Sequence, residues 1–435
     1  MANLAYVQHN AMPSQPAPPG TKGAVHWVKE NLFSSPLNTI MTLIGVYLVI
    51  TTVPALAKFY IFDAVWTGAD RDACLKDKVG REIGACWAFV VDRYQYFIYG
   101  SYPIVERWRV NLVFALFAVG VVWMLWQRVP FKAVGAMLFF AVLPVTAWML
   151  LYGGSLSWKW YMVAAAALAV WAVYGDYSAL KKGDTGIFSR PETLLRYGVI
   201  LAMALGGLMI GYAGLPRVDT GLWGGVLVTL LIAAVGIVFS LPLGIALALG
   251  RRSKLPIIKM FSVIFIEFVR GVPLITVLFM ANTMLPLFVP QEWSPDRLLR
   301  PLIGVALFAA AYMAEVVRGG LQAIPKGQYE GAMSLGLGYG SMMRLIVLPQ
   351  ALRIVIPGIV NTFIGLFKDT TLVTVVGIFD FMRAVEASMI DPTWATPTTR
   401  ATGYAFAAIF YFICCWGMSR YSISVEGKLA AGQKR

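Results

Sequence analysis

Long apolar stretches separated by short polar segments form the pattern of this sequence. A helix needs about 20 apolar residues to cross the hydrocarbon core of a bilayer, because its backbone amides must be hydrogen-bonded within the segment. Ten stretches come close to this length: 37–57, 110–126, 133–152, 160–174, 197–215, 224–250, 260–287, 302–317, 354–379 and 401–416. The stretch at 160–174 is short, so the pattern predicts an all-α integral membrane protein with about ten, and at least about eight, transmembrane helices.

The composition supports a lipid environment. The chain has 435 residues, of which 59% are hydrophobic and 13% charged, and its mean hydropathy is +0.70. Soluble domains contain roughly 45–50% apolar residues. The net charge of +14 does not indicate nucleic-acid binding, because the basic residues lie singly or in pairs between apolar stretches.

The distribution of lysine and arginine predicts the orientation. With the N-terminus inside, the cytoplasmic segments hold 20 of the 36 basic residues, whereas the short outer loops hold 6. Basic residues are retained on the cytoplasmic side when loops are short. We therefore expect both chain ends in the cytoplasm and the long loop 58–109 outside.

The polar segments divide the chain into regions. We expect a disordered cytoplasmic tail at 1–36, an accessory N-terminal membrane region at 37–215 with the outer loop 58–109, a second membrane region at 221–424 with a cytoplasmic loop at 318–353, and a cytoplasmic tail at 425–435. The first apolar stretch begins only near residue 37, which argues against a cleavable signal peptide. The sequence has no internal repeat strong enough to suggest a transporter built from duplicated halves.

Cysteine and histidine offer little material for a metal or redox site. His9 and His26 lie in the N-terminal tail, and Cys414 and Cys415 are adjacent in an apolar segment. We expect no metal. Cys74 and Cys86 bracket a polar part of the outer loop, where an oxidising compartment would permit a disulfide. The sequence alone does not decide whether this disulfide forms.

The cytoplasmic loop 318–353 carries the clearest signals of function. Pro325 suits a helix start, and Glu330 lies in the first turns, where the helix dipole favours an acid. The glycines from Gly336 to Gly340 predict a turn after this helix. An apolar face of Tyr329, Met333, Gly336 and Leu337 points toward the cytosol. Such a face fits a groove on another protein or the surface of the bilayer.

The motif in this loop resembles a known signature. Glu330-Gly331-Ala332, followed by Gly336 and by Leu348-Pro349, resembles the EAA signature of ABC importer permeases. The resemblance implies a coupling helix that docks in a cleft of an ATPase through Tyr329, Glu330, Gly331, Ala332, Gly336, Leu348 and Pro349. Gly331 stands where the signature usually has alanine, which costs up to about 1 kcal/mol of helix propensity.

Further motifs narrow the resemblance. The segments 268–274, 311–320, 324–329 and 368–372 look like the polar amino acid permeases of the histidine/glutamine type, over about 221–424. The first half, with 85–89 and 102–109, is similar to the larger permease subunit of the general L-amino-acid transporters.

This resemblance implies a type I ABC importer permease core in the bacterial inner membrane. The partners it implies are a dimer of ATPase subunits, a periplasmic amino-acid-binding protein and a second permease. The unequal build of the chain favours a heterodimer with a shorter permease. ATP and Mg²⁺ would be bound by the ATPase, and this chain would bind no cofactor. It has no phosphate-binding loop, since its only Gly-Lys pair, Gly427-Lys428, is followed by Leu429.

Charged residues inside the predicted spans are candidates for the substrate path. Lys368 and Asp369, followed by Thr370, interrupt an apolar stretch, and Glu267 and Arg270 lie three apart on one helical face. Such groups cost several kcal/mol in lipid unless they face protein or water. Each pair can line the path of an amino acid, where Lys could meet a carboxylate and Asp an ammonium group. Each can equally be a structural ion pair or a contact with the partner permease.

The pattern favours a structural bridge over a role in the substrate path for Glu315 and Arg318, which lie three apart at the cytoplasmic end of their span. The chain as a whole is predicted to be a transport subunit and not an enzyme. A gradient-driven secondary transporter or channel is the main alternative. A membrane-embedded enzyme is a weaker one, because no nucleophile–base or metal-ligand spacing is present.

Overall fold

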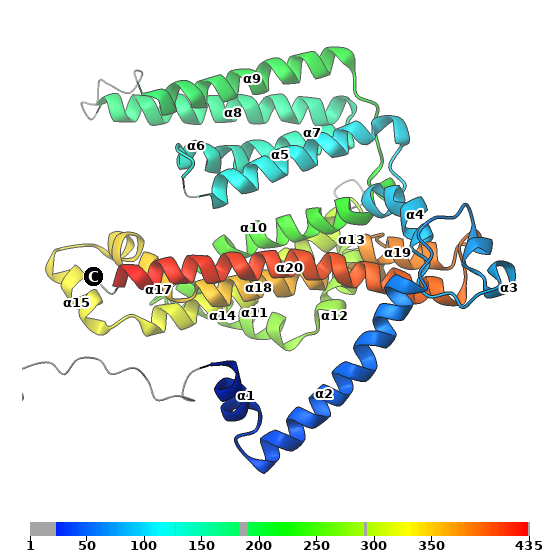
Figure 1. Cartoon of the computed structure of the whole chain (residues 1–435). Helices are drawn as coiled ribbons and strands as arrows, with labels where there is room; N and C mark the ends of the chain where they lie inside the picture. The colour runs from blue at the N-terminus through cyan, green and yellow to red at the C-terminus, as the bar shows by residue number, and fades with distance from the viewer. Residues whose placement is uncertain (1–22, 127, 182–189, 291–293, 434–435) are drawn as a thin grey trace, which may run out of the picture. The chain divides into compact units, whose positions relative to one another are not determined.

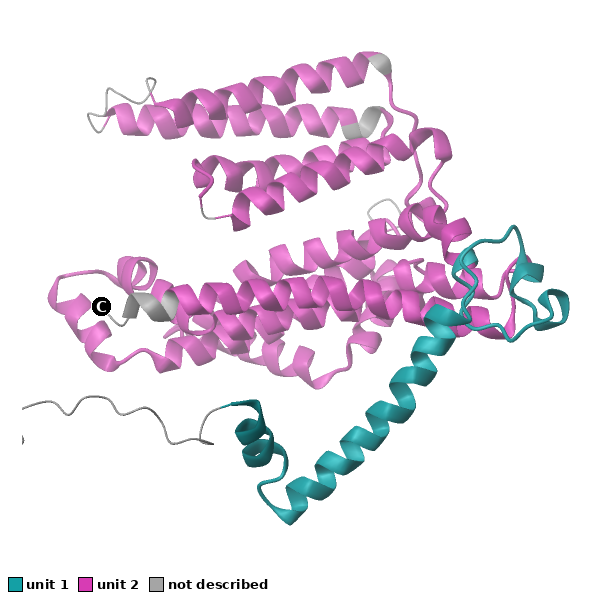
Figure 2. Ribbon diagram, in the orientation of Figure 1, with its two compact units in different colours: residues 1–88 teal, residues 89–435 magenta. Residues whose placement is uncertain are grey.

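The computed structural model describes residues 23–126, 128–181, 190–290 and 294–433. The chain divides into two compact units, residues 1–88 and 89–435 (Figure 2). Within the described residues the structure is helical, and β-structure is limited to three isolated bridges. This confirms the predicted all-α class.

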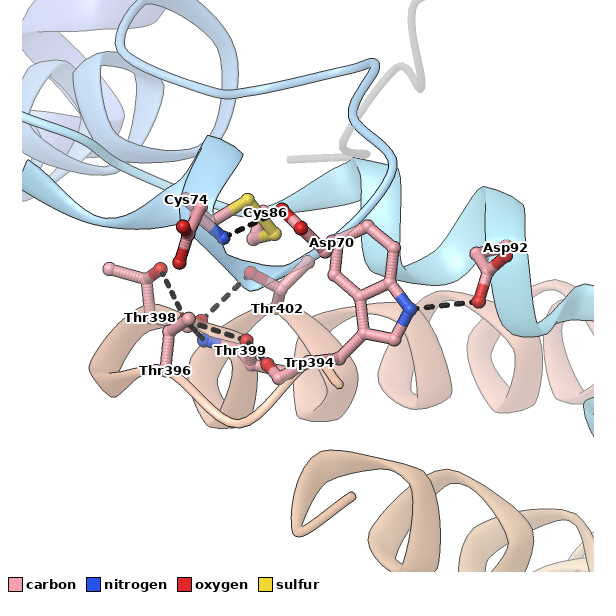
Figure 3. The surroundings of a disulfide bond; sticks show 10 residues. Asp70, Cys74, Cys86, Asp92, Trp394, Thr396, Thr398, Thr399 and Thr402 are labelled. Carbon is pink, nitrogen blue, oxygen red and sulfur yellow. Dashed lines mark hydrogen bonds between the residues drawn. A yellow bond between two sulfur atoms is a disulfide. The ribbon is translucent and has the colours of Figure 1, made fainter. Parts of the chain in front are cut away.

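The first unit contains a membrane-spanning helix and a disulfide-closed loop. Its elements are α1 (Ala24–Leu32), α2 (Pro36–Ala57), a π-turn (Lys58–Phe62), a 3-10 turn (Arg71–Cys74) and α3 (Lys76–Val79). Helix α2 begins where Ser35 accepts a hydrogen bond from the Asn38 amide, at 3.2 Å, with Pro36 in the first turn. Cys74 and Cys86 form a disulfide with Cα atoms 5.8 Å apart (Figure 3).

Two expectations about the chain ends change. The predicted disordered tail at 1–36 is wrong for residues 24–32, which form helix α1; residues 1–22 lie outside the described part. The cause is a short helix-forming run, Ala-Val-His-Trp-Val-Lys-Glu-Asn-Leu, that is too short to register as a span. At the other end, helix α20 continues to Gln433, through most of the predicted tail at 425–435.

The second unit carries the remaining helices (Figure 1). Its first half comprises α4 (Trp87–Tyr99, starting at the unit boundary), α5 (Arg107–Leu125), α6 (Lys132–Met137), a π-turn (Leu138–Val142), α7 (Leu143–Tyr152), α8 (Gly154–Lys181) and α9 (Pro191–Ala213). Its second half comprises α10 (Gly225–Arg251), α11 (Pro256–Gly271), α12 (Leu274–Phe279), a π-turn η7 (Met280–Met284), α13 (Leu285–Phe288), α14 (Leu299–Ala323), α15 (Lys326–Ser334), α16 (Tyr339–Met342), a π-turn (Met343–Val347), α17 (Leu348–Ile354), α18 (Ile356–Asp369), a 3-10 helix η10 (Thr370–Val376), α19 (Phe381–Met389) and α20 (Pro397–Gln433).

In the described part of the chain, nine helices are long and apolar enough to cross a membrane. A tenth candidate is the pair formed by Pro256–Gly271 and Leu274–Phe288, which is bent by 107°. Helices α10 and α14 both end on the predicted cytoplasmic side, so this pair must return the chain to the outer side. The predicted span 260–287 is therefore a broken one, interrupted at Val272-Pro273 because proline removes a backbone donor. The short stretch at 160–174 belongs to a 24-residue span, Trp158–Lys181.

One hydrophobic cluster of the second unit joins the two halves of the chain. Its buried side chains include Tyr102, Val110 and Leu151 from the first half and Leu227 and Leu302 from the second. The compact unit that begins at Phe89 thus extends across the boundary expected near residue 215.

Arg109 adds a buried polar contact to this region. Its side chain is fully buried, lies 2.6 Å from the Glu106 carboxylate, and donates to the carbonyl oxygens of Leu150 and Pro216 at 3.4 and 3.0 Å. It therefore holds the start of α5 to the end of α7 and to the segment before α10.

Helix α4 is attached to the outer end of the second half. The Trp394 indole is fully buried and donates to the Asp92 carboxylate at 2.8 Å (Figure 3). Arg93 forms an ion pair with Asp391 at 2.9 Å, and the rings of Phe89 and Trp394 lie edge to face at 6.4 Å. We call these residues of α4 and of the segment before α20 the outer joint.

Glycines allow α10 to lie close against its neighbours. A Cβ at Gly244 would lie 2.7 Å from the Met313 Cβ and 3.0 Å from the Ala314 amide nitrogen. A Cβ at Gly236 would lie 2.7 Å from a methyl group of Leu366. Small residues at such positions permit close helix packing in membranes.

Candidate functional site

The loop between α14 and α17 contains the predicted short helix. Helix α15 follows Pro325 and ends at Ser334, and Gly336 adopts a left-handed conformation with φ of 72°. The amides of Gly336 and Leu337 donate to the carbonyl oxygens of Met333 and Ala332 at 2.9 and 3.2 Å. This is a glycine-terminated helix end, and the positive φ explains why glycine occupies position 336.

The apolar residues of this loop do not share one face. Ala332 is 2% exposed, and Tyr329 and Leu337 pack on a buried cluster at the inner end of the second unit. Met333, Leu335 and Tyr339 are 58%, 77% and 58% exposed. The predicted single face of Tyr329, Met333, Gly336 and Leu337 is therefore wrong, because half of it packs against the chain's own core.

The other predicted coupling residues fall into two groups. Glu330, Gly331 and Gly336 are exposed, and a Cβ at either glycine would meet nothing within 4 Å. Leu348 is half-buried against the same inner cluster, and Pro349 is exposed in the first turn of α17. Glu330, Gly331, Gly336 and Pro349 are accessible to a partner, whereas Ala332 and Leu348 support the loop from inside.

A cluster of charged side chains lies beside this loop. Glu315 on α14 accepts from Arg251 at the end of α10, at 2.9 Å, and from Arg318 at 2.8 Å, and it lies 3.6 Å from Arg270 on α11. Glu267 pairs with Arg251 at 2.8 Å. The predicted bridge between Glu315 and Arg318 is confirmed.

The structure separates the two predicted charge pairs of the substrate path. Among the described ion pairs, Glu267 and Arg270 bond to Arg251 and Glu315 and not to each other. Their neighbour Ile266 belongs to the inner cluster. Leu366, which precedes Lys368 and Asp369, packs with the cluster that includes Tyr102 and Leu302 instead.

Lys368 and Asp369 lie at the junction of α18 with the 3-10 helix η10. Lys368 is exposed and Asp369 half-buried, and the described part of the structure contains no ion pair of either side chain. Thr370 is buried and donates to the Phe367 carbonyl oxygen at 2.8 Å. The span Ile356–Val376 thus contains two neighbouring, opposite charges that form no ion pair among the residues that the structure describes.

Two further polar groups escaped sequence reasoning. Asn282, in the π-turn of the broken span, has a buried Oδ1 with no hydrogen-bond partner in the described structure, and its amide nitrogen lies 3.5 Å from the Val376 carbonyl oxygen. The sequence did offer a signal for Asn282, because its side chain is a polar amide within an apolar span. Arg252 donates to the Tyr329 hydroxyl at 3.0 Å, and only the tertiary structure shows that contact.

Asp380 lies at the outer end of the second unit. It is fully buried and caps α19, where it accepts from the Met382 and Arg383 amides at 3.2 and 3.0 Å. Burial raises the pKa of its carboxyl to about 6, and these two amide hydrogen bonds oppose the rise.

The described residues contain no cluster of side chains that could hold a metal ion. Nine of the described helices are long and apolar enough to cross a membrane, one further candidate span is broken, and one span contains two charged residues without an ion pair. Together with the exposed apolar side chains of the loop predicted to be cytoplasmic, these features are typical of a membrane permease.

Comparison with known proteins gives the family. A family model described as a binding-protein-dependent transport system inner membrane component matches residues 240–417. The inner membrane amino-acid ABC transporter permease protein YhdY of Escherichia coli is 42% identical over 421 residues, which cover 97% of each chain. The glutamate/glutamine/aspartate/asparagine transport system permease protein BztC of Rhodobacter capsulatus is 40% identical and covers 99% of each chain. A probable amino-acid permease protein of Bacillus subtilis, YxeN, is 37% identical over 153 residues, 35% of this chain and 68% of the other.

The chain belongs to the amino-acid ABC transporter permeases. It is a multi-pass protein of the bacterial inner membrane and a transport subunit. The alternative of a gradient-driven transporter or channel is not favoured.

Proposed function

We propose that this chain forms the amino acid path of an importer whose ATP hydrolysis takes place on a separate dimer of ATPase subunits, and that α15 is its docking element. The exposed side chains of Met333, Leu335 and Tyr339 carry this proposal. They are large apolar groups on a cytoplasmic loop, where only a protein groove or the bilayer surface would cover them. Glu330, Gly331 and Gly336 lie between or beside them, and the small residues permit a close approach.

The substrate path involves Lys368, Asp369 and Thr370. Two opposite charges without an ion pair inside a span require water, a partner chain or a bound zwitterion, and an amino acid supplies both complementary charges. Asn282 adds an unpaired carbonyl group from the broken span that lies against η10. The name of the Rhodobacter relative indicates acidic amino acids and their amides, and we propose polar and general L-amino acids for this chain.

Glu267 and Arg270 would act at the inner end of the same path. Three arginines and two glutamates meet there, so the cluster carries one net positive charge, beside the groups that hold the coupling loop. Opening the inner side of the path would require some of these ion pairs to exchange partners.

We further propose a second, shorter permease subunit and a periplasmic amino-acid-binding protein as partners. The chain contains an extra set of helices before its permease core, and one copy of that set per transporter would suffice. ATP and Mg²⁺ would be bound by the ATPase, in keeping with the absence of a phosphate-binding loop in the sequence.

The test is to purify the tagged chain from its native host in mild detergent and to identify its partners. Wild type should recover an ATPase and a shorter permease. Gly336→Asp should lose the ATPase, because it places a negative charge beside the docking surface. Gly336→Asn is the matched control, since it has the same shape and no charge, and asparagine also tolerates the left-handed conformation.

Recovery of wild type alone, in a form that transports amino acids, would contradict the proposal. The same conclusion would follow if uptake collapsed with the proton gradient while cellular ATP was maintained. Either result would revive the gradient-driven transporter.

A further inference from the structure

The end of helix α10 contacts the coupling loop through one side chain. Arg252, the residue that directly follows α10 and caps its C-terminal end, donates to the Tyr329 hydroxyl at 3.0 Å and to the Leu321 carbonyl oxygen at 3.1 Å. Its guanidinium lies 5.5 Å from the centre of the Tyr329 ring. The Tyr329 hydroxyl in turn donates to the Leu321 carbonyl oxygen at 3.2 Å. Arg252 caps α10, Tyr329 belongs to α15 and Leu321 to α14, and each of the three contacts the other two.

This triangle is the hydrogen-bonded link between α15 and α10 in the described part of the chain. Outside this triangle, the described side-chain hydrogen bond from α15 to another helix is the one that Gln328 accepts from Gln350 on α17, at 3.0 Å. A displacement of α15 by an ATPase would therefore reach α10 through the bond between Arg252 and Tyr329 and through the packing of Tyr329 and Ala332 on the inner cluster.

Arg251, the preceding residue, extends the link to two more helices. Its guanidinium bonds Glu267 on α11 at 2.8 Å and Glu315 on α14 at 2.9 Å. Adjacent arginines thus face different partners, one on the coupling loop and one on the charged cluster at the inner end of the path. Movement of the α10 end would disturb both sets of contacts together.

The opposite end of α10 is held just as specifically. The Gly225 amide donates to the Phe379 carbonyl oxygen at 2.9 Å, and the Thr229 hydroxyl accepts from the Phe381 amide at 2.9 Å. In between, Gly236 lies against Leu366, two residues before Lys368. Helix α10 therefore runs from the coupling loop, past the predicted substrate residues, to the outer cap of α19.

We propose that Arg252 is a positioning residue of the transport cycle, which passes the movement of α15 to α10 through Tyr329. The inference rests on the proposed docking of an ATPase on α15. Arg252 is largely exposed, so its removal leaves the buried clusters of the second unit in place. Its loss should uncouple ATP hydrolysis from transport and leave assembly intact.

The experiment uses the complete transporter in vesicles of phosphatidylethanolamine and phosphatidylglycerol, with its binding protein loaded with L-glutamine or L-glutamate. The measured quantity is the amino acid imported per phosphate released. Arg252→Met keeps the length of the side chain and removes its charge and donors. Arg252→Lys keeps the charge, and Tyr329→Phe keeps the ring without the hydroxyl. Lys254→Met, in the same connection, is the matched control for loss of one positive charge.

Arg252→Met should lower the import ratio at least about fivefold, the lower end of the factors by which linked sites are coupled. The ATPase and the second permease should co-purify as with wild type. Arg252→Lys should lie nearer to wild type than to Arg252→Met, and Tyr329→Phe should show a smaller loss. Lys254→Met should match wild type.

An unchanged ratio in Arg252→Met would overturn the inference, as would loss of the ATPase from that variant or an equal loss of coupling in Lys254→Met. These outcomes differ from failure of the proposed function, in which the wild-type complex itself shows no ATP-dependent import.

Discussion

Gly244 sets the distance between α10 and α14, and its replacement tests whether that close contact stabilises the second unit. The Cβ of any other residue would lie 2.7 Å from the Met313 Cβ and 3.0 Å from the Ala314 amide nitrogen. Neither atom is the free end of a flexible side chain. The helices must therefore separate, or the backbone must shift.

The expected effect of Gly244→Val follows from two opposing contributions. Overpacking of a close contact costs about 1–3 kcal/mol. Valine recovers only a few tenths of the roughly 1 kcal/mol by which glycine disfavours a helix relative to alanine. Because the contact involves backbone, we expect the upper end of the range, a net loss of about 2–3 kcal/mol.

The matched control is Gly319→Val on α14, where a Cβ would meet nothing within 4 Å. Unfolding of the purified chain in mixed micelles, followed by circular dichroism against increasing denaturant, gives both stabilities on one scale. Gly319→Val should equal wild type within the error of the assay or slightly exceed it. Equal stability of the two variants would refute the reasoning, because it would show that α10 and α14 do not need their close approach.

Three further predictions concern other parts of the chain. The pKa of Asp380 is raised to about 6, so the fold disfavours its ionised form. Wild type should therefore gain up to about 3 kcal/mol of stability as pH falls from about 7 to about 4. Asp380→Asn should lack this gain, and identical profiles of stability against pH for the two proteins would contradict the prediction. Cys74→Ser removes the disulfide to Cys86 and should lower the stability of the first unit by about 3 kcal/mol. Limited proteolysis should then cleave the outer loop faster than in wild type. An unchanged cleavage rate would count against this prediction. Gly331→Ala should stabilise the helical state of α15 by about 1 kcal/mol, because a Cβ at this exposed position meets no other atom. We expect slower hydrogen exchange of the α15 amides, with the ATPase still bound. Loss of the ATPase would show that a methyl group does not fit the docking cleft.

Sequence patterns were sufficient to predict the features that depend on a single helix or on one short stretch of chain. The apolar stretches predicted the spans, because every backbone amide in lipid must be bonded within its own helix. Pro325, Glu330 and Gly336 predicted the start and end of α15, because helix termini depend on local conformation. The bridge between Glu315 and Arg318 was predictable for the same reason, since both residues lie on one helix.

Tertiary contacts decided the features that the sequence could not supply. The periodicity of α15 placed Tyr329 and Met333 on one face, but only the position of the inner cluster determines that Tyr329 packs and Met333 stays exposed. Glu267 and Arg270 had the spacing of an ion pair, yet both took partners from other helices. Pro273 accounts for the break in the stretch 260–287, but the 107° bend between the two parts depends on how α11 and α12 pack against α14.

Within the second unit, the packing of the helices before α10 on the helices that follow bears on how such permeases diversify. Lipid tails and leucine side chains are equally apolar, so a helix added against α10 exchanges contacts with lipid for contacts with protein at little gain or loss. An ancestral core could therefore have acquired or shed these helices without rebuilding its outer surface, and the shorter relative from Bacillus subtilis is compatible with that freedom. Selection would act instead on the polar attachments that lipid cannot replace, namely the contacts of Arg109 and the bond from Trp394 to Asp92 in the outer joint.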